Sequence, residues 1–167
     1  FNGSAGLLGK IVFEPNTGKT FNDLCSSKSV LQRVHDSLPQ YPKSVLNQIE
    51  GEINIRDVIK AFIQEDELAV GIFTDVGRSL GQMIASLTNL LNPDHILLGD
   101  EIPQTERMRS IIEHEAKQYI SPGVSLNFDM FILDFQSHRQ SKIDPALRGA
   151  SRYIVDAFIQ SLDFTEL

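Results

Sequence analysis

Cysteine, positive charge and long apolar runs are all scarce in this sequence. Cys25 is the sole cysteine among 167 residues, so no disulfide can form within the chain, which fits a reducing compartment such as the cytoplasm. Acidic residues outnumber lysine and arginine by 22 to 15. Because binding to nucleic acid needs a basic surface, we do not expect this chain to bind nucleic acid by itself. No apolar run approaches the roughly 18 residues of a membrane span, so no membrane partner is expected.

The usual motifs for phosphate and metal binding are also missing. Neither the G-x-x-x-x-G-K-[ST] nor the G-x-G-x-x-G pattern occurs. The four histidines are scattered along the chain, at His35, His95, His114 and His138, with no metal-ligand spacing. Cys25 has no base near it in the sequence and is expected to be a buried small apolar residue. The residues therefore predict no metal site and no cofactor.

Apolar residues at helical spacing predict most of the secondary structure. A helix is expected from about residue 24 to 38, two short helices between 42 and 66, and a long amphipathic helix over 66–93 ended by Asn92-Pro93. Its glycines, Gly77 and Gly81, are one turn apart and suggest close packing on another element. The expected apolar face of this helix consists of Ala69, Ile72, Phe73, Val76, Leu80, Met83, Ile84, Leu87 and Leu91.

Strands alternate with these helices in the remaining sequence. Short strands are expected over residues 10–14, at His-Ile-Leu-Leu (95–98) and near 126–132, with helices at 103–119 and from about 144 onward. The inner face of the first of these two helices is expected to hold Met108, Ile111, Ile112, Ala116 and Tyr119. The acidic groups Glu65-Asp66-Glu67 and Glu113/Glu115 are interpreted as solvated helix surface. Strands and helices joined by long crossovers predict an α/β domain.

Two predicted strand or helix ends could bind a ligand, because open α/β sheets bind ligands at the carboxyl ends of their strands. Gly99 and Asp100 follow the strand at 95–98 and lead into a helix N-terminus. Gly149, within Leu-Arg-Gly-Ala-Ser (147–151), could admit a nucleotide base or sugar. Each has a simpler alternative: a strand-to-helix turn at Gly99, and packing on the sheet at Gly149.

The order of these segments resembles the C-terminal half of the ROK family, which comprises sugar-responsive repressors, uncharacterised reading frames and sugar kinases. The resemblance is strongest to its N-acetylglucosamine- and xylose-type transcriptional repressors. Asn-Gly-Ser-Ala-Gly-Leu-Leu-Gly-Lys-Ile (2–11) is similar to the turn that contains the family's G-E-I-G-H motif. Residues 76–100 resemble the family's long helix, its Asn-Pro stop and its following strand, and 147–151 resembles its closing helix.

The resemblance implies the C-terminal lobe of an actin-like ATPase (ribonuclease H-like) α/β fold, with the long amphipathic helix packed on a mixed sheet. It also implies a degenerate site. The family's sugar-binding glutamate and zinc-binding histidine correspond to Leu7 and Lys10, and a second sugar-binding glutamate corresponds to Asn22. The cysteines of the family's zinc cluster are absent here. Gly99, Asp100 and Gly149 are the implied equivalents on the nucleotide side.

The function implied is that of the effector-sensing and oligomerising domain of a ROK-type transcriptional regulator. The chain opens on Phe1, so we expect a single domain, 1–167, that lacks the family's N-terminal lobe and helix-turn-helix. A sugar or sugar phosphate is the implied effector, DNA would bind only through the absent segment, and a homo-oligomer is expected. No catalytic residue is expected. The alternatives are a fragment of a ROK sugar kinase and a module for protein contacts that binds no sugar.

Overall fold

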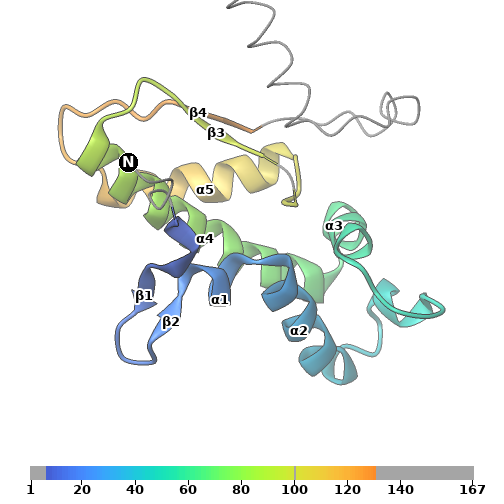
Figure 1. Cartoon of the computed structure of the whole chain (residues 1–167). Coiled ribbons are helices and arrows are strands. Elements are labelled where there is room, and N and C mark those ends of the chain that lie inside the picture. Colours follow the sequence, from blue (N-terminus) through green and yellow to red (C-terminus); the bar gives the residue numbers. More distant parts are fainter. Residues whose placement is uncertain (1–6, 100, 131–167) are drawn as a thin grey trace, which may run out of the picture. The chain divides into compact units, whose positions relative to one another are not determined.

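The computed structural model describes residues 7–99 and 101–130, all within one compact unit (Figure 1). Short 3-10 turns precede or connect the larger elements: η1 (Leu8–Lys10), η2 (Leu38–Gln40) and η3 (Val45–Gln48). The strands are β1 (Val12–Glu14), β2 (Lys19–Thr20), β3 (Ile96–Leu98) and β4 (Phe128–Met130). The helices are α1 (Phe21–Cys25), α2 (Ser27–Ser37), α3 (Ile55–Ile63), α4 (Glu67–Leu91) and α5 (Glu106–Tyr119).

Side-chain caps explain where the helices begin. Asn54 forms a capping box with Asp57 at the start of α3. Ser26 caps α2, and Asn92 ends α4 in the left-handed conformation just before Pro93. The predicted helix at 103–119 begins only at Glu106, because the side chain of Thr105 accepts a hydrogen bond from the backbone N–H of Met108.

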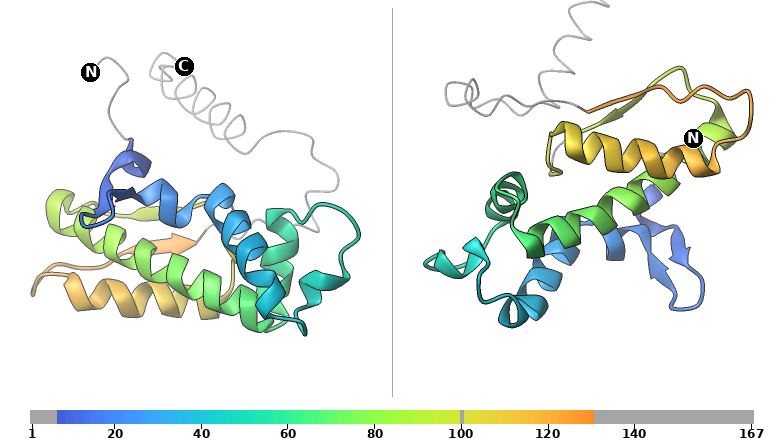
Figure 2. Two further views of the ribbon diagram at one scale, coloured as in Figure 1. Left: turned by 90° about the horizontal axis from the view of Figure 1, so that it is seen from below. Right: turned by 180° about the vertical axis from the view of Figure 1, so that it is seen from behind.

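Helix α4 is the centre of the described part of the chain, and α5 is its principal neighbour. Figure 2 shows the two helices side by side, with α1 and α2 on the opposite side of α4 from β3 and β4. Gly77 and Gly81 lie where α5 approaches most closely, which confirms the predicted close packing. An added Cβ at Gly81 would lie 2.7 Å from the carbonyl oxygen of Ile112, and one at Gly77 would lie 2.7 Å from the Ile111 side chain.

The apolar faces are confirmed in their middles and wrong at their ends. Ile72, Phe73, Val76, Met83 and Ile84 of α4 are buried, as are Met108, Ile112 and Ala116 of α5. Leu91 and Tyr119, predicted to face the core, are instead 66% and 53% exposed. Both are the last residues of their helices, where no element of the described chain covers them.

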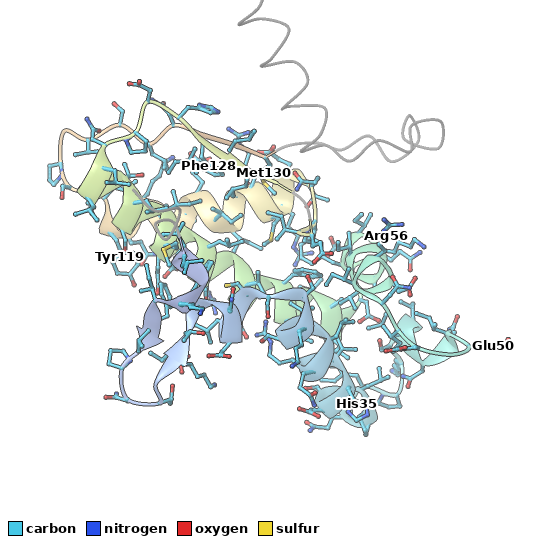
Figure 3. All side chains as sticks on the ribbon, in the orientation of Figure 1. His35, Glu50, Arg56, Tyr119, Phe128 and Met130 are labelled. Carbon is cyan, nitrogen blue, oxygen red and sulfur yellow. The ribbon has the colours of Figure 1, made fainter. Side chains whose placement is uncertain are left out.

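The strand pairing of the described residues differs from the mixed sheet that the resemblance implies. The described residues form two separate pairs: β1 with β2, antiparallel, and β3 with β4, parallel. Among these residues the long helix packs chiefly on α5 and not on a sheet. Figure 3 shows Phe128 and Met130 of β4 on the side that faces α5, and Phe128 is 5% exposed.

Two acidic residues that were interpreted as solvated surface are buried. Glu115 is 9% exposed and accepts a hydrogen bond of 2.7 Å from the amide of Gln82, which joins α5 to α4. Asp66 is 7% exposed and caps α4. Each carboxylate has found hydrogen-bond donors that helical spacing alone does not reveal.

No helix among the described residues combines the length and the apolar character needed to cross a bilayer.

Candidate functional site

The turn that holds Leu7 and Lys10 is bonded directly to α1. Within the turn, the backbone N–H of Lys10 donates to the carbonyl of Leu7 at 3.0 Å, and that of Ile11 donates to Leu8 at 3.1 Å. The N–H of Phe21 at the start of α1 then donates to the carbonyl of Ile11 at 2.9 Å. This bond brings the next residue, Asn22, to the turn.

The side chain of Asn22 lies against Gly9, between the positions of Leu7 and Lys10 in the chain. It occupies the space that a Cβ on residue 9 would need, so any larger residue there would require the Asn22 side chain to rotate away. The structure thus brings Asn22 to the turn that carries Leu7 and Lys10, although 12 residues separate it from Lys10 in the sequence. Composition and periodicity contain no signal for this contact.

The surface around this turn is apolar and open. Leu7 is 60% exposed, Ile11 46% and Val12 53%, and Lys10 and Asn22 are also exposed. The adjacent carboxylate, Asp23, accepts hydrogen bonds from the hydroxyl and the backbone N–H of Thr20. These bonds hold the pKa of Asp23 below its usual value, so it stays ionised and is already engaged as a helix cap. The turn therefore offers the amide of Asn22, the side chain of Lys10 and apolar contact, and the neighbouring carboxylate serves as a helix cap.

A cleft of about 880 Å³ adjoins Asn22, between α1 and α2 on one side and α4 on the other. Asp75 lies in it, 3.8 Å from the guanidinium of Arg33 and 3.7 Å from that of Arg78. Burial lowers the pKa of Arg33, and the charge of Asp75 opposes this effect. This cleft could not be identified from the sequence, because its lining comes from separate elements and forms no local motif.

Cys25 is half-buried beside this cleft and packs against the core, which partly confirms the predicted buried apolar role. Burial raises the pKa of its thiol to about 11, and the neighbouring Ser79 and Arg33 offset only part of that increase. Its sulfur lies 4.0 Å from the carbonyl oxygen of Val76 in α4. At neutral pH the group is a protonated thiol, which is a poor nucleophile and a poor metal ligand.

We expect iodoacetamide to alkylate Cys25 slowly in the folded protein. The increase in its pKa from 9.0 to about 11 leaves about 100-fold less thiolate at pH 8 than in the unfolded chain. Because the pKa is higher in the folded state, the associated stability is present below pH 9 and is lost as the pH rises through about 11. Alkylation is run with and without urea, samples are quenched at intervals, and mass spectrometry measures the alkylation rates of the unfolded and folded protein. Equal rates in the two samples would contradict the burial of this thiol.

The implied nucleotide side is described only at Gly99. This residue follows β3 and is exposed, and a Cβ built on it would meet no atom within 4 Å. Close packing therefore does not explain the glycine, and the backbone at this strand end is accessible. Asp100 and Gly149, with the whole of 147–151, lie outside the described residues.

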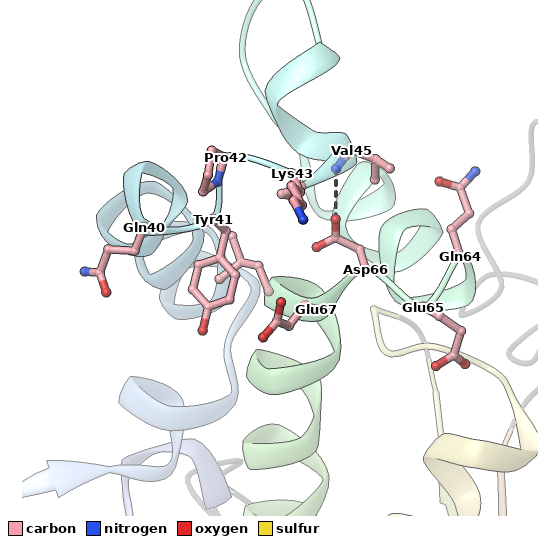
Figure 4. A pocket seen from close by; sticks show the side chains of 11 residues that line it. Gln40, Tyr41, Pro42, Lys43, Val45, Gln64, Glu65, Asp66 and Glu67 are labelled. Atoms are coloured by element: carbon pink, nitrogen blue, oxygen red, sulfur yellow. Dashed lines mark hydrogen bonds between the residues drawn. The ribbon is translucent and has the colours of Figure 1, made fainter.

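A separate pocket of about 690 Å³ surrounds Asp66 and contains none of the predicted site residues (Figure 4). One oxygen of Asp66 accepts from the backbone N–H of Val45 at 2.8 Å, and the other accepts from that of Ala69 at 3.1 Å. Both carboxylate oxygens are thus used, and they join the first residue of η3 to the start of α4. We interpret this pocket as structural.

The residues at the turn do not fit a zinc ion. Zinc in proteins is held by thiolate, imidazole and carboxylate groups, and Leu7, Lys10 and Asn22 supply none of these. Within residues 7–99 and 101–130 there is no group of three or more histidine, cysteine, aspartate or glutamate side chains placed to hold a metal.

The match to known proteins spans both the turn and the long helix. The ROK family profile matches residues 2–153 of the 167. The chain belongs to the ROK family. It is 30% identical over 115 residues to the DNA-binding transcriptional dual regulator NagC of Escherichia coli, a match that covers 64% of this chain and 28% of NagC.

A solved structure of a ROK family transcriptional regulator, a homolog of E. coli MLC, superposes with a TM-score of 0.66 at 29% identity. The superposition covers 75% of this chain and 34% of the regulator. A glucokinase from Halalkalibacterium halodurans is 26% identical over 136 residues, which is 74% of this chain and 41% of the enzyme. This ROK chain thus spans less than half the length of each of these relatives, and it has their helix-rich α/β, actin-like ATPase fold.

Proposed function

We propose that this chain is the effector-sensing and oligomerising portion of a ROK-type, sugar-responsive transcriptional regulator whose sugar and zinc sites have degenerated. It would be the C-terminal part of that protein, and DNA would bind through an N-terminal helix-turn-helix outside the chain. The match to NagC and the 29% identity to a solved ROK regulator support the regulatory role. The acidic chain itself, with its net charge of −7, would not supply the DNA-binding surface.

The observation that carries the proposal is the placement of Asn22 against Gly9. In the resemblance, Leu7, Lys10 and Asn22 stand for a sugar-binding glutamate, a zinc-binding histidine and a second sugar-binding glutamate. The amide of Asn22 can still donate hydrogen bonds to sugar hydroxyls and accept them, although the bonds it accepts are weaker than those of a carboxylate. The side chain of Leu7 can form no hydrogen bond. A weak sugar site without metal follows from this set of residues.

Thermal melting in the presence of sugars tests the proposal. We expect N-acetylglucosamine, glucose or one of their 6-phosphates to raise the melting temperature in a dose-dependent way. A ligand present at 100 times its Kd adds about 2.7 kcal/mol to the free energy of unfolding. Asn22→Ala should abolish the increase. Asn16→Ala, an exposed asparagine in the turn between β1 and β2, should preserve it.

The absence of any shift up to about 100 mM sugar would contradict the sensing role. That result would instead favour a module for protein contacts, which the exposed Leu7, Ile11 and Val12 would suit.

A fragment of a sugar kinase is the alternative that the glucokinase match favours. The turn argues against it, because Leu7 and Lys10 stand where the resemblance places a sugar-binding glutamate and a zinc-binding histidine. We expect no transfer of phosphate from ATP to a hexose by this chain, either as it is or with Leu7→Glu. A coupled assay for ADP release, run with the unsubstituted chain and the variant side by side, measures this.

A further inference from the structure

Arg33 is a half-buried guanidinium with few hydrogen bonds. Its side chain lies in the wall of the cleft between α1, α2 and α4 and is 32% exposed. A guanidinium has five N–H donors. Within the described residues Nη2 donates to the carbonyl oxygen of Leu24 at 3.2 Å, whereas Nε is buried without a hydrogen-bond partner. The desolvation of this charge is therefore poorly compensated, which is why burial lowers the pKa of Arg33.

The carboxylate that faces Arg33 does not supply the missing hydrogen bonds. Asp75 is 63% exposed, and its oxygens lie 3.8 Å from the guanidinium of Arg33 and 3.7 Å from that of Arg78. Hydrogen-bonded pairs of this kind have N···O distances of about 2.7–2.9 Å. One solvated carboxylate is thus shared between two arginines, and most of their N–H donors remain available to another acceptor.

The other carboxylates that line the cleft are each engaged by a neighbour in the sequence. They therefore contribute little to neutralising the two arginines. Glu14 pairs with Lys19 at 3.8 Å, Asp23 accepts from the hydroxyl and the N–H of Thr20, and Asp36 accepts from the amide of Gln32 at 2.9 Å.

The part of the cleft around Asp75 is positively charged as a result. Lys28 also lines the cleft and forms no ion pair with a described residue. Arg33, Arg78 and Lys28 are thus three cationic side chains against the one carboxylate of Asp75, an excess of two positive charges. A cleft of this kind favours an anion that carries several acceptor oxygens.

We propose that this cleft binds a phosphate group, either as inorganic phosphate or as the phosphate monoester of a small metabolite. A phosphate dianion matches the excess of two positive charges, and a planar guanidinium can donate two parallel hydrogen bonds to its oxygens. The volume of about 880 Å³ is that of a small-molecule site and leaves room for an organic group beside the phosphate. The inference stands apart from the proposed function, because its phosphate contacts come from none of the residues assigned to the sugar site.

Titration with inorganic phosphate, followed by NMR at an ionic strength held constant with sodium chloride, tests the proposal. We expect saturable shifts of the Nε–H resonances of Arg33 and Arg78, with a Kd of about 1 mM or lower. Glycerol 3-phosphate should shift the same resonances, and glycerol should shift none. Tighter binding of glycerol 3-phosphate would support a monoester as the ligand, and equal affinities would support the phosphate group alone. The lack of saturable shifts up to about 10 mM of both phosphates would overturn the proposal.

Variants of the charged residues give a second readout with opposite signs. Arg33→Gln and Arg78→Gln should each weaken phosphate binding about tenfold, because each removes charge-assisted hydrogen bonds. Arg78 is 60% exposed, so its variant keeps the test available even if Arg33→Gln does not fold. Asp75→Asn should strengthen binding, since it removes the competing negative charge.

Arg107→Gln is the matched control. This arginine also forms an ion pair, with Glu65, and lies outside the cleft, so its loss should leave phosphate affinity unchanged. Unchanged affinity in Arg78→Gln, or weaker binding in Asp75→Asn, would overturn the proposal. Inorganic phosphate contains no sugar, so its binding is measured independently of the sugar-dependent melting shift.

Discussion

Replacing Gly81 by alanine is expected to lower the free energy of unfolding by about 3 kcal/mol. The added Cβ would lie 2.7 Å from the carbonyl oxygen of Ile112 and 3.0 Å from the backbone nitrogen of Ala116, so α5 would have to move away from α4. These neighbours are backbone atoms of a helix and cannot rotate aside. The higher helix propensity of alanine, about 1 kcal/mol, offsets only part of this loss.

Two other glycines of α4 serve as controls for this prediction. Gly71 is exposed and no atom lies within 4 Å of an added Cβ, so Gly71→Ala should stabilise the protein by about 1 kcal/mol. The added Cβ of Gly77→Ala would meet chiefly the Ile111 side chain, which can adjust more easily than backbone atoms. Its effect on the free energy of unfolding should therefore lie between those of Gly81→Ala and Gly71→Ala. Urea denaturation followed by circular dichroism measures all three. Equal effects of Gly81→Ala and Gly71→Ala would contradict the close packing of α4 on α5.

The substitution Asp66→Ala, which removes the carboxylate, is expected to lower the free energy of unfolding by about 3 kcal/mol. The side chain accepts two backbone hydrogen bonds, one that caps α4 at Ala69 and one from Val45 across the loop, and it is 7% exposed. Both N–H groups would lose a charged acceptor, and α4 would lose its cap.

The neighbouring substitutions sharpen this test. Asp66→Asn retains one acceptor oxygen and should cost about half as much as Asp66→Ala. Glu67→Ala changes an exposed carboxylate one residue away and should alter stability by no more than about 0.5 kcal/mol. The same denaturation experiment measures these variants. A loss for Glu67→Ala as large as that for Asp66→Ala would show that general charge effects at the start of α4, and not the specific bonds, set its stability.

Local signals were sufficient to predict most helices of this ROK chain. Asn54 caps α3, Ser26 caps α2, and Asn92-Pro93 ends α4, because caps and stops act through hydrogen bonds within a few residues. The close packing at Gly77 and Gly81 was also predicted, since two glycines one turn apart on an apolar helix leave room for a second helix to approach its backbone.

Features that depend on distant residues could not be predicted in the same way. The burial of Glu115 requires Gln82 on another helix, and that of Asp66 requires the N–H of Val45, 21 residues earlier. The exposure of Leu91 and Tyr119 depends on whether another element covers the end of each helix, which helical periodicity does not show. The split into two small sheets likewise reflects pairing between distant segments, which a period-two pattern cannot specify.

The candidate site was located through resemblance and not through its own chemistry. Leu7, Lys10 and Asn22 form no catalytic or metal-binding pattern, so composition and local motifs do not indicate a site at these residues. Only the family's motif drew attention to these positions, and the contact of Asn22 with Gly9 is consistent with their forming one surface. The roles assigned to them, together with Gly99 on the nucleotide side, stay predictions.

The central claim is that this turn keeps the position of a sugar and zinc site while lacking its ligands. Metal analysis tests it most directly. The purified protein should be dialysed against excess zinc, passed through a desalting column and analysed by plasma mass spectrometry alongside its Lys10→His variant. The account predicts far less than one zinc per chain in both proteins, because Lys10→His restores one ligand and leaves the cysteines absent. One zinc retained per chain by the unsubstituted protein would contradict it.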